Sequence, residues 1–265
     1  MTDPSRPKGP RIIAMANQKG GVGKTTTAIN LAAGLVELGY RVLVVDLDPQ
    51  GNASTGLGIT AEKRDLTTYD LVLGEVDAAD VIQATDIEGL YISPATVDLS
   101  SADIEMISNE KRSFLLHDAL RQRSLDAFRL DFVLIDCPPS LSLLTVNAMV
   151  AAHSVLVPLQ SEFFALEGLS QLMLTVREVR QTANSALRIE GVVLTMYDQR
   201  NNLSRQVEAD ARDNLGDLVF KTVIPRNVRV SEAPSYAMPV LTYDPESKGS
   251  QAYRALAEEL VVRGG

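Results

Sequence analysis

Two lysines flank a glycine-rich run near the amino end of the chain. The run reads Lys19-Gly-Gly-Val-Gly-Lys-Thr-Thr26, with a short apolar segment before it and a helical pattern after it. Glycines let a backbone fold around phosphate oxygens, and successive N–H groups at a helix N-terminus form an anion cradle. Lys24 would reach the β- and γ-phosphates of a nucleotide, and the Thr25 hydroxyl would ligate Mg²⁺. The predicted nucleotide-binding residues in this loop are Lys19, Gly20, Gly21, Val22, Gly23, Lys24, Thr25 and Thr26.

Lys19 stands where the ordinary phosphate-binding pattern has its first glycine. Because Lys24 and the backbone already serve one phosphate site, this second lysine needs a different role. It would neutralise phosphates bound by a facing subunit, as an arginine finger does in trans. The alternative is a solvated loop lysine.

Three aspartates follow apolar runs of strand length. Asp46 and Asp48 lie two positions apart in the run Val44-Val-Asp-Leu-Asp-Pro-Gln-Gly-Asn52, and Asp136 ends the run Phe132-Val-Leu-Ile-Asp136. Open α/β sheets bind ligands at the carboxyl ends of their strands. Of the first pair, one would hold an Mg²⁺-bound water and the other would orient the attacking water. Asp136 is the acid expected to serve Mg²⁺ directly. Asp-Pro and Gly-Asn are typical of turns, but a turn alone does not explain two acids so close together.

The composition narrows the class of protein. Of 265 residues, 45% are apolar and 22% are charged, which excludes wholesale disorder, collagen and coiled-coil architecture. The single cysteine, Cys137, excludes an intramolecular disulfide or a Cys-rich metal site and fits a reducing cytoplasm; buried packing is its expected role. No segment is typical of a signal peptide or a membrane span. No Asn-Lys-x-Asp run is present, so adenine is favoured over guanine.

Strand-like and helical patterns alternate along the chain, which predicts βαβ units and a parallel sheet. We expect one α/β domain over residues 11–265 with a doubly wound, mostly parallel sheet, and a disordered arm over residues 1–10. The predicted strands are Arg11–Ala16, Arg41–Val45, Leu90–Ser93, Phe132–Ile135, Ser154–Val157, Ile189–Thr195 and Val219–Val223. The predicted helices are Thr25–Leu38, Ile104–Leu125, Leu141–Ala151, Glu167–Arg180, Ser204–Leu215 and Gln251–Val262.

These residues resemble the ParA/MinD ATPases, P-loop NTPases with a deviant Walker A motif that carries the extra lysine. Five runs are similar to the ParA/Soj branch, whose members segregate chromosomes and low-copy plasmids. They span 16–27, 48–52, Phe163–Leu169, Leu194–Asp198 and Ile224–Ser235. The resemblance extends from Arg11 to the C-terminal helical run and implies ATP and Mg²⁺ as ligands.

The resemblance also implies roles for single residues. Lys19 matches the lysine that crosses an ATP-sandwich homodimer, and Gly20 lies where a bulkier side chain should obstruct that dimer. Asp48 matches the aspartate needed for hydrolysis, and Pro225 and Asn227 match the segment that holds adenine. The expected catalytic residues are thus Lys19, Lys24 and Asp48, and the expected metal ligands are Thr25, Asp46 and Asp136.

Sequence-independent binding of double-stranded DNA is implied as well. Arg200 and Arg229 match positions implicated in DNA binding in the family, with Arg226 or Arg205 as rivals. The chain carries a net charge of −9, which opposes binding to phosphates. Residues 199–231 nevertheless hold six basic side chains against four acidic ones, and a dimer would place two such patches together.

The expected function is an ATP-dependent switch on the nucleoid within the cytoplasm. A ParB-type centromere-binding partner would stimulate slow ATP hydrolysis and thereby release the dimer from DNA. The alternatives are a MinD-like membrane-cycling ATPase, a cargo-positioning ATPase and a metabolic P-loop ligase. The C-terminal run from Ser250 has two acids and no lysine, which disfavours docking on a membrane.

Overall fold

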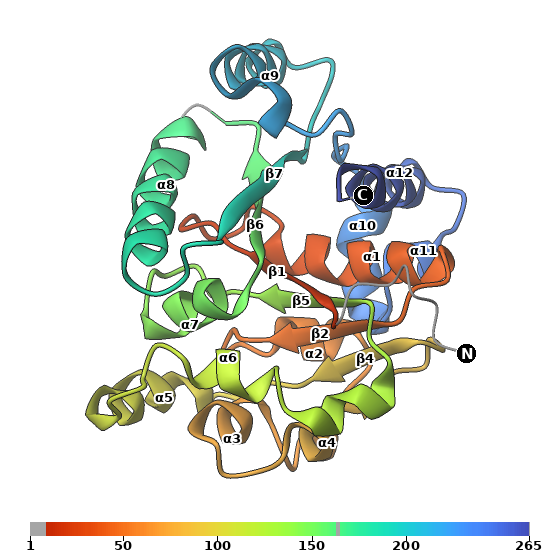
Figure 1. Cartoon of the computed structure of the whole chain (residues 1–265). Coiled ribbons are helices and arrows are strands. Elements are labelled where there is room, and N and C mark those ends of the chain that lie inside the picture. Colours follow the sequence, from red (N-terminus) through yellow and green to blue (C-terminus); the bar gives the residue numbers. More distant parts are fainter. Residues whose placement is uncertain (1–8, 163–164, 265) are drawn as a thin grey trace.

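Seven strands form one sheet in the order β3-β4-β2-β5-β1-β6-β7 (Figure 1). The computed structural model describes residues 9–162 and 165–264. All the neighbouring strands pair in parallel except β3, which runs antiparallel to β4. The predicted doubly wound, mostly parallel sheet is confirmed. The strands are β1 (Arg11–Met15), β2 (Val42–Asp46), β3 (Gln83–Ala84), β4 (Leu90–Ser93), β5 (Phe132–Asp136), β6 (Ser154–Gln160) and β7 (Arg188–Thr195).

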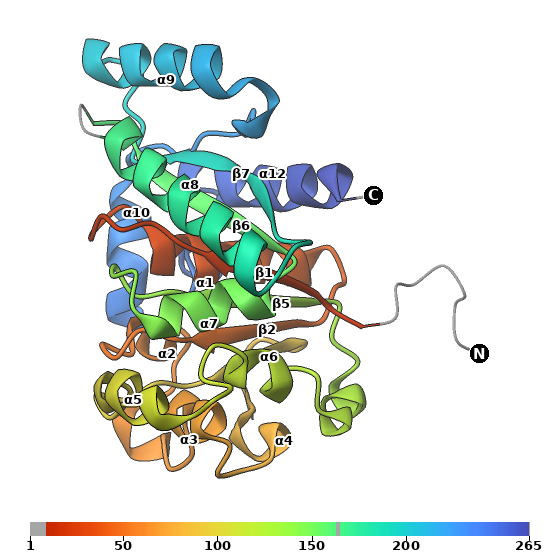
Figure 2. The same cartoon turned by 60° about the vertical axis from the view of Figure 1, so that its left-hand side comes forward.

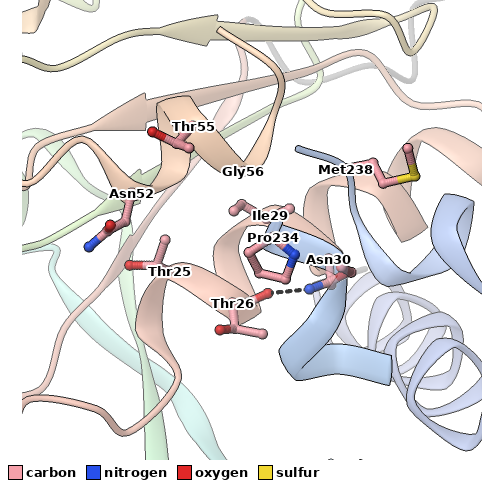
Figure 3. A pocket seen from close by; sticks show the side chains of 10 residues that line it. Thr25, Thr26, Ile29, Asn30, Asn52, Thr55, Gly56, Pro234 and Met238 are labelled. Atoms are coloured by element: carbon pink, nitrogen blue, oxygen red, sulfur yellow. Dashed lines mark hydrogen bonds between the residues drawn. The ribbon is translucent and has the colours of Figure 1, made fainter. Parts of the chain in front are cut away.

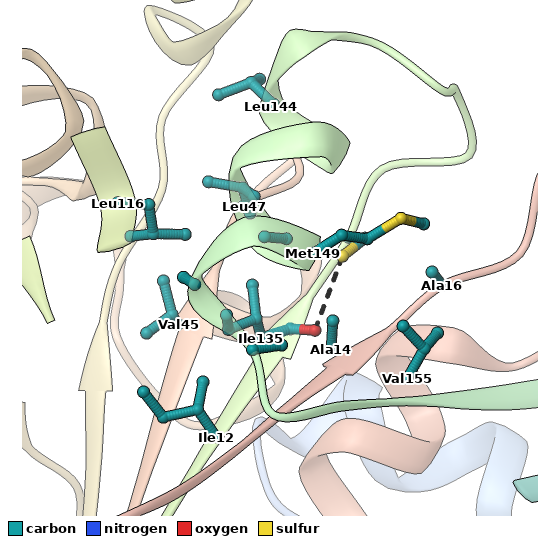
Figure 4. Packing of buried hydrophobic residues seen from close by; sticks show 14 of the residues in the cluster. Ile12, Ala14, Ala16, Val45, Leu47, Leu116, Ile135, Leu144, Met149 and Val155 are labelled. Carbon is teal, nitrogen blue, oxygen red and sulfur yellow. Dashed lines mark hydrogen bonds between the residues drawn. The ribbon is translucent and has the colours of Figure 1, made fainter. Parts of the chain in front are cut away.

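The central strands are apolar without alternation because helices cover both faces of the sheet. Every residue of β2 and β5 is buried. In β1, Ile13 and Met15 pack into one core cluster with α1 and α12, while Ile12 and Ala14 pack into the other with α7 and α8. Figure 4 shows the second cluster, in which Met149 and Leu144 of α7 lie over the sheet.

Twelve α-helices connect or flank the strands in the described part of the chain (Figures 1 and 2). They are α1 (Lys24–Glu37), α2 (Asn52–Gly56), α3 (Thr68–Leu73), α4 (Ala78–Val81), α5 (Leu99–Glu105), α6 (Leu115–Ala119), α7 (Leu143–Ala151), α8 (Ala165–Thr182), α9 (Asn202–Leu215), α10 (Val228–Glu232), α11 (Val240–Tyr243) and α12 (Lys248–Arg263). Among these helices, none combines the length and the apolar character needed to cross a bilayer.

The helix predicted over Ile104–Leu125 is wrong. That stretch holds the end of α5, two short 3₁₀ turns and α6. Its middle, residues 109–113, is entirely polar, and the Asn109 side chain accepts a hydrogen bond from the Lys111 N–H. Asn147 of α7 holds the Arg112 carbonyl at 2.7 Å, so tertiary contacts replace helical ones.

The strand predicted over Val219–Val223 is also wrong. Only an isolated bridge joins Val219 to Val192 of β7. The N–H groups of Lys221 and Thr222 instead donate to the Glu259 carboxylate of α12, each at 2.8 Å. A side chain thus takes the donors that a strand ladder would use.

Several expectations fall on residues outside those described. Most of the predicted disordered arm lies in residues 1–8, and the family-like run from Phe163 begins at residues 163–164. The extent of a single domain over residues 11–265 stays a prediction.

Candidate nucleotide-binding site

The glycine-rich loop joins the carboxyl end of β1 to the first turn of α1, as predicted. Gly21 and Gly23 adopt φ angles of 73° and 87°, the left-handed region that glycine enters without strain. Gly20 does not, and a Cβ built there meets no atom within 4 Å. The fold of this one chain therefore places no steric limit on position 20.

Two neighbouring strands hold the loop in place. The Thr195 hydroxyl, at the end of β7, donates to the Val22 carbonyl at 2.8 Å. The Asn17 amide donates to the Pro158 carbonyl of β6 at 2.7 Å, and its oxygen accepts from the Lys19 N–H at 3.0 Å. The loop is thus fixed from the β6–β7 side before any ligand binds.

Lys24 lies buried at the start of α1. Its Nζ donates to the Lys19 carbonyl at 3.1 Å, the one hydrogen bond of that ammonium within the described residues. Burial lowers the pKa of Lys24, while the nearby Asp136, Cys137 and Asp48 raise it. An ammonium with spare donors in this position suits an incoming anion.

Asp136 is fully buried beside Asp46 of the neighbouring strand, since the two residues pair in the β2–β5 register. Neither oxygen of Asp136 accepts a hydrogen bond of normal geometry from the described residues. Burial raises the pKa of Asp136 well above its usual range, and Asp46 adds to this, whereas the nearby Thr25 hydroxyl and Lys24 oppose it. Oxygen atoms left without donors in this way fit an Mg²⁺ ion, which binds through one or two carboxylates plus phosphates and waters.

Asp46 is already engaged in shaping the loop after β2. Its Oδ2 accepts from the N–H and the hydroxyl of Ser54 at 2.8 and 2.6 Å, and its Oδ1 accepts from the Asp48 N–H at 3.3 Å. Burial raises the pKa of Asp46 to about 6 against these hydrogen bonds. Its predicted role as a metal ligand stays a prediction.

Asp48 opens a tight turn at the same edge of the sheet. Its Oδ1 accepts from the Gln50 N–H at 3.0 Å, and its carbonyl accepts from the Gly51 N–H at 2.9 Å. The structure brings Lys24, Thr25 and the three aspartates to one edge of the sheet, as the sequence predicted.

Lys19 is paired within its own chain. Its Nζ lies 2.6 Å from Oε2 of Glu162, which follows β6, and both side chains are about half exposed. No pattern in the sequence indicates this partner, because the two residues are far apart in the chain.

The segment predicted to hold adenine lies beside the end of β7. Tyr197 bridges to Pro225, and the Arg226 N–H donates to the Tyr197 carbonyl at 2.9 Å. Asn227 caps α10 with its side-chain oxygen, which accepts from the Arg229 N–H at 2.8 Å. The end of β7 thus lies between the phosphate loop, which Thr195 contacts, and this segment, which Tyr197 contacts.

A pocket of about 280 Å³ lies against the first turns of α1 (Figure 3). Thr25 and Thr26 line it from α1, Asn52 and Thr55 from α2, and Pro234 from the segment after α10. The pocket thus lies between α1, α2 and the segment after α10, next to Thr25, which is expected to meet Mg²⁺.

The arginines expected to bind DNA are exposed, and two of them are held by carboxylates. Arg200 forms an ion pair with Asp198 at 3.1 Å. Arg229 contacts Glu232 at 2.9 Å and Asp244 at 3.2 Å. The other two arginines bind differently: Arg226 donates to the Tyr197 carbonyl through its backbone N–H, and Arg205 donates to the Asn202 side chain.

Cys137 is buried, as predicted, and burial raises the pKa of its thiol. It has the character of a packing residue rather than a reactive one.

Comparison with solved structures gives matches over nearly the whole chain. A cobyrinic acid a,c-diamide synthase from Mycobacterium smegmatis with bound ADP and magnesium is 40% identical, with a TM-score of 0.82 and coverage of 95% of this chain and 94% of that one. The septum site-determining protein MinD from Pyrococcus horikoshii, complexed with Mg-ADP, is 31% identical, with a TM-score of 0.79 and coverage of 97% and 98%.

Comparison with known sequences is more specific. A family model described as an AAA domain matches residues 10–189. The chromosome partitioning protein ParA of Caulobacter vibrioides is 56% identical over 257 residues, which is 96% of this chain and 94% of the relative. The sporulation initiation inhibitor protein Soj of Bacillus subtilis is 50% identical over 256 residues, 96% and 99% of the two chains. The chain belongs to the ParA/Soj family of chromosome-partitioning ATPases.

Proposed function

We propose that this chain is a nucleotide-gated switch that binds ATP with Mg²⁺, closes into a dimer on DNA and is released by hydrolysis. The observation that carries the proposal is the buried carboxylate of Asp136, which lies next to Lys24 and Thr25 and accepts no hydrogen bond of normal geometry from the described residues. A buried polar group without a well-formed hydrogen bond destabilises a fold, so the retention of Asp136 points to a ligand.

Thr25 and Asp136 would hold Mg²⁺, with Asp46 beside them. When bound, Mg²⁺ supplies positive charge that offsets the charge of the transferred phosphoryl group. Lys24 would counter charge on the β- and γ-phosphates, and the backbone N–H groups of the loop would orient them. The known structures of relatives with ADP and magnesium support these ligands.

Asp48 would orient the attacking water. Its turn sits at the edge where phosphate is expected, and positioning supplies much of the catalysis in phosphoryl transfer. Lys19 would leave Glu162 and reach the phosphates held by a second copy of the chain. Pro225 and Asn227 would hold the adenine base at the far side of the loop.

DNA phosphates would take the place of carboxylates at the exposed arginines. Arg200, Arg226 and Arg229 are the proposed contacts, and two of them already hold acidic groups that a phosphate resembles. Two such patches in a dimer would bind more strongly than one, which makes DNA binding depend on ATP. A ParB-type partner would then stimulate hydrolysis on the nucleoid.

The packing of the C-terminal helix favours DNA rather than a membrane as the surface that this protein binds. The apolar face of α12 is buried against α1, where Tyr253, Leu256 and Leu260 are fully covered. This face is therefore not available to a membrane.

ATP hydrolysis with and without plasmid DNA tests the enzymatic half of the proposal. We expect Lys24→Ala to lower the rate by about a hundredfold, since it removes a preorganised charge from the phosphate site. Lys111→Ala is the matched control, because Lys111 is exposed in a distant loop. Unchanged hydrolysis in Lys24→Ala would contradict the site.

A second candidate is an ATP-dependent amide-forming ligase. It rests on the 40% identity to the structure described as a cobyrinic acid a,c-diamide synthase. ATP turnover that requires a small carboxylic acid and ammonia or glutamine, and that ignores DNA, would favour this candidate over the switch.

A further inference from the structure

One guanidinium ties α2 to the segment that follows β4. Arg64 donates from Nε and Nη2 to the Ile59 carbonyl at 3.1 and 2.7 Å. Its Nη1 donates to the Ala95 carbonyl at 2.9 Å, and its Nη2 also donates to the Thr55 hydroxyl at 2.8 Å. A planar fork with five donors can make all four bonds at once, which an ammonium cannot.

The same two segments are joined a second time near Asp46. The Ala95 N–H donates to the Ser54 hydroxyl at 2.9 Å, and that hydroxyl donates to Asp46. Ala95 thus binds α2 directly through its N–H and indirectly through its carbonyl, which accepts from Arg64. The helix is fixed at Ser54 from the sheet side and at Thr55 by Arg64.

Arg64 also packs directly on the turn that begins at Asp48. Gly51 closes that turn with a φ of 62°, and a Cβ built there would lie 2.4 Å from Nη1 of Arg64 and 2.9 Å from the Ala95 carbonyl. The Gly51 N–H donates to the Asp48 carbonyl, so the guanidinium and Asp48 meet opposite ends of one short turn.

We propose that Arg64 is a positioning residue for ATP hydrolysis. It holds α2 and the turn from Asp48 to Gly51 in register with the sheet edge, without itself touching the nucleotide. This inference rests on the proposed function, because it acts through the water-orienting role of Asp48. Misplacement of a catalytic group by about 1 Å lowers rates by about a hundredfold. Loss of the Arg64 hydrogen bonds should therefore slow the chemical step.

Nucleotide affinity and single-turnover hydrolysis, measured separately, test the proposal. The variants are Arg64→Gln and Arg64→Lys, and Lys63→Gln is the control because its exposed side chain makes no bond among the described residues. We expect ATP affinity to change by less than about threefold while the single-turnover rate falls about tenfold or more in both Arg64 variants. Arg64→Lys should rescue little, since the fork and not the charge does the positioning.

The outcomes separate the two hypotheses. Wild-type protein that fails to hydrolyse ATP contradicts the proposed function itself. Active wild type with unchanged rates in both Arg64 variants overturns the positioning role alone. A parallel loss of ATP affinity, hydrolysis and melting temperature also overturns it, because Arg64 would then support only the fold.

Discussion

Nζ of Lys19 lies 2.6 Å from Oε2 of Glu162, across a sequence separation of 143 residues. The lysine expected to act on a facing subunit is therefore held by an acid of its own chain. Both groups are about half exposed, so the pair adds little to stability. The pair matters instead because it determines where the Lys19 side chain lies.

Replacing Glu162 with glutamine should ease dimer formation. Glu162→Gln removes the charge that competes with phosphate for Lys19, so dimers should form with ATP at about twofold to fivefold lower protein concentration. Sedimentation velocity measures this directly. Glu37→Gln, which breaks an exposed pair with Arg254, is the control. Equal dimerisation of wild type and Glu162→Gln would count against a competing role for Glu162.

Asp136→Asn should separate stability from ligand binding. Replacing a buried carboxylate that accepts no hydrogen bond of normal geometry from the described residues should raise the melting temperature without nucleotide by about 2 °C or more. The same change should remove the additional stabilisation that ATP and Mg²⁺ give the wild type. Thermal melts in EDTA and in Mg-ATP report both effects. A variant that melts lower than wild type in EDTA would show that Asp136 is satisfied in the ligand-free fold.

His153 should lower the free energy of unfolding as the pH falls below about 6.5. Burial lowers the pKa of His153 from 6.5, helped by Arg121, Arg188 and Arg11, while its Nδ1 accepts from the Ile12 N–H. A lowered histidine pKa contributes stability that is present above about pH 6.5 and is lost as the pH falls through the folded-state pKa.

Denaturant unfolding between pH 7.5 and pH 5 checks the effect of His153. The free energy of unfolding of wild type should fall relative to that of His153→Gln as the pH is lowered. Parallel pH profiles for the two proteins would mean that His153 does not titrate differently in the folded state.

Gly20→Val should leave the monomer intact and impair the dimer. A Cβ at position 20 meets nothing within 4 Å in this chain, so the melting temperature without nucleotide should stay near wild type. ATP-dependent dimerisation and DNA binding should be lost, because the added side chain would face the second copy. A destabilised monomer would instead place the constraint on glycine within the chain.

The core of the fold and the phosphate loop could be predicted from local pattern. The strands β2 and β5 are continuous apolar runs that end in aspartate, and β1 is an apolar run after Arg11 that leads into the glycine-rich loop. These signals need no knowledge of tertiary contacts. The break in the stretch from Ile104 could not be predicted, because the contact that supports it comes from Asn147. Glu259 likewise diverts the donors of Lys221 from a strand ladder.

The acids and lysines of the candidate site could be predicted from the sequence, but the residues that hold them in place could not. Asp136 ends β5, Asp48 follows the end of β2, and Lys24 begins α1 after the glycine-rich loop, so their types and spacing carry the signal. Arg64 and Glu162 act through contacts with distant segments, and an isolated arginine or glutamate gives no pattern to detect. Such partners can be identified only once the fold has brought the distant segments together.

DNA binding measured without nucleotide, with ADP and with ATP tests the central claim most directly. At about 100 mM salt, we predict that wild type binds plasmid DNA only with ATP, and that Asp48→Ala stays bound because it cannot hydrolyse the nucleotide. Charge reversal of Arg200 and Arg229 should abolish that binding. Binding that is equal in all nucleotide states, or absent in every one, would contradict the account of a DNA-bound ATP switch.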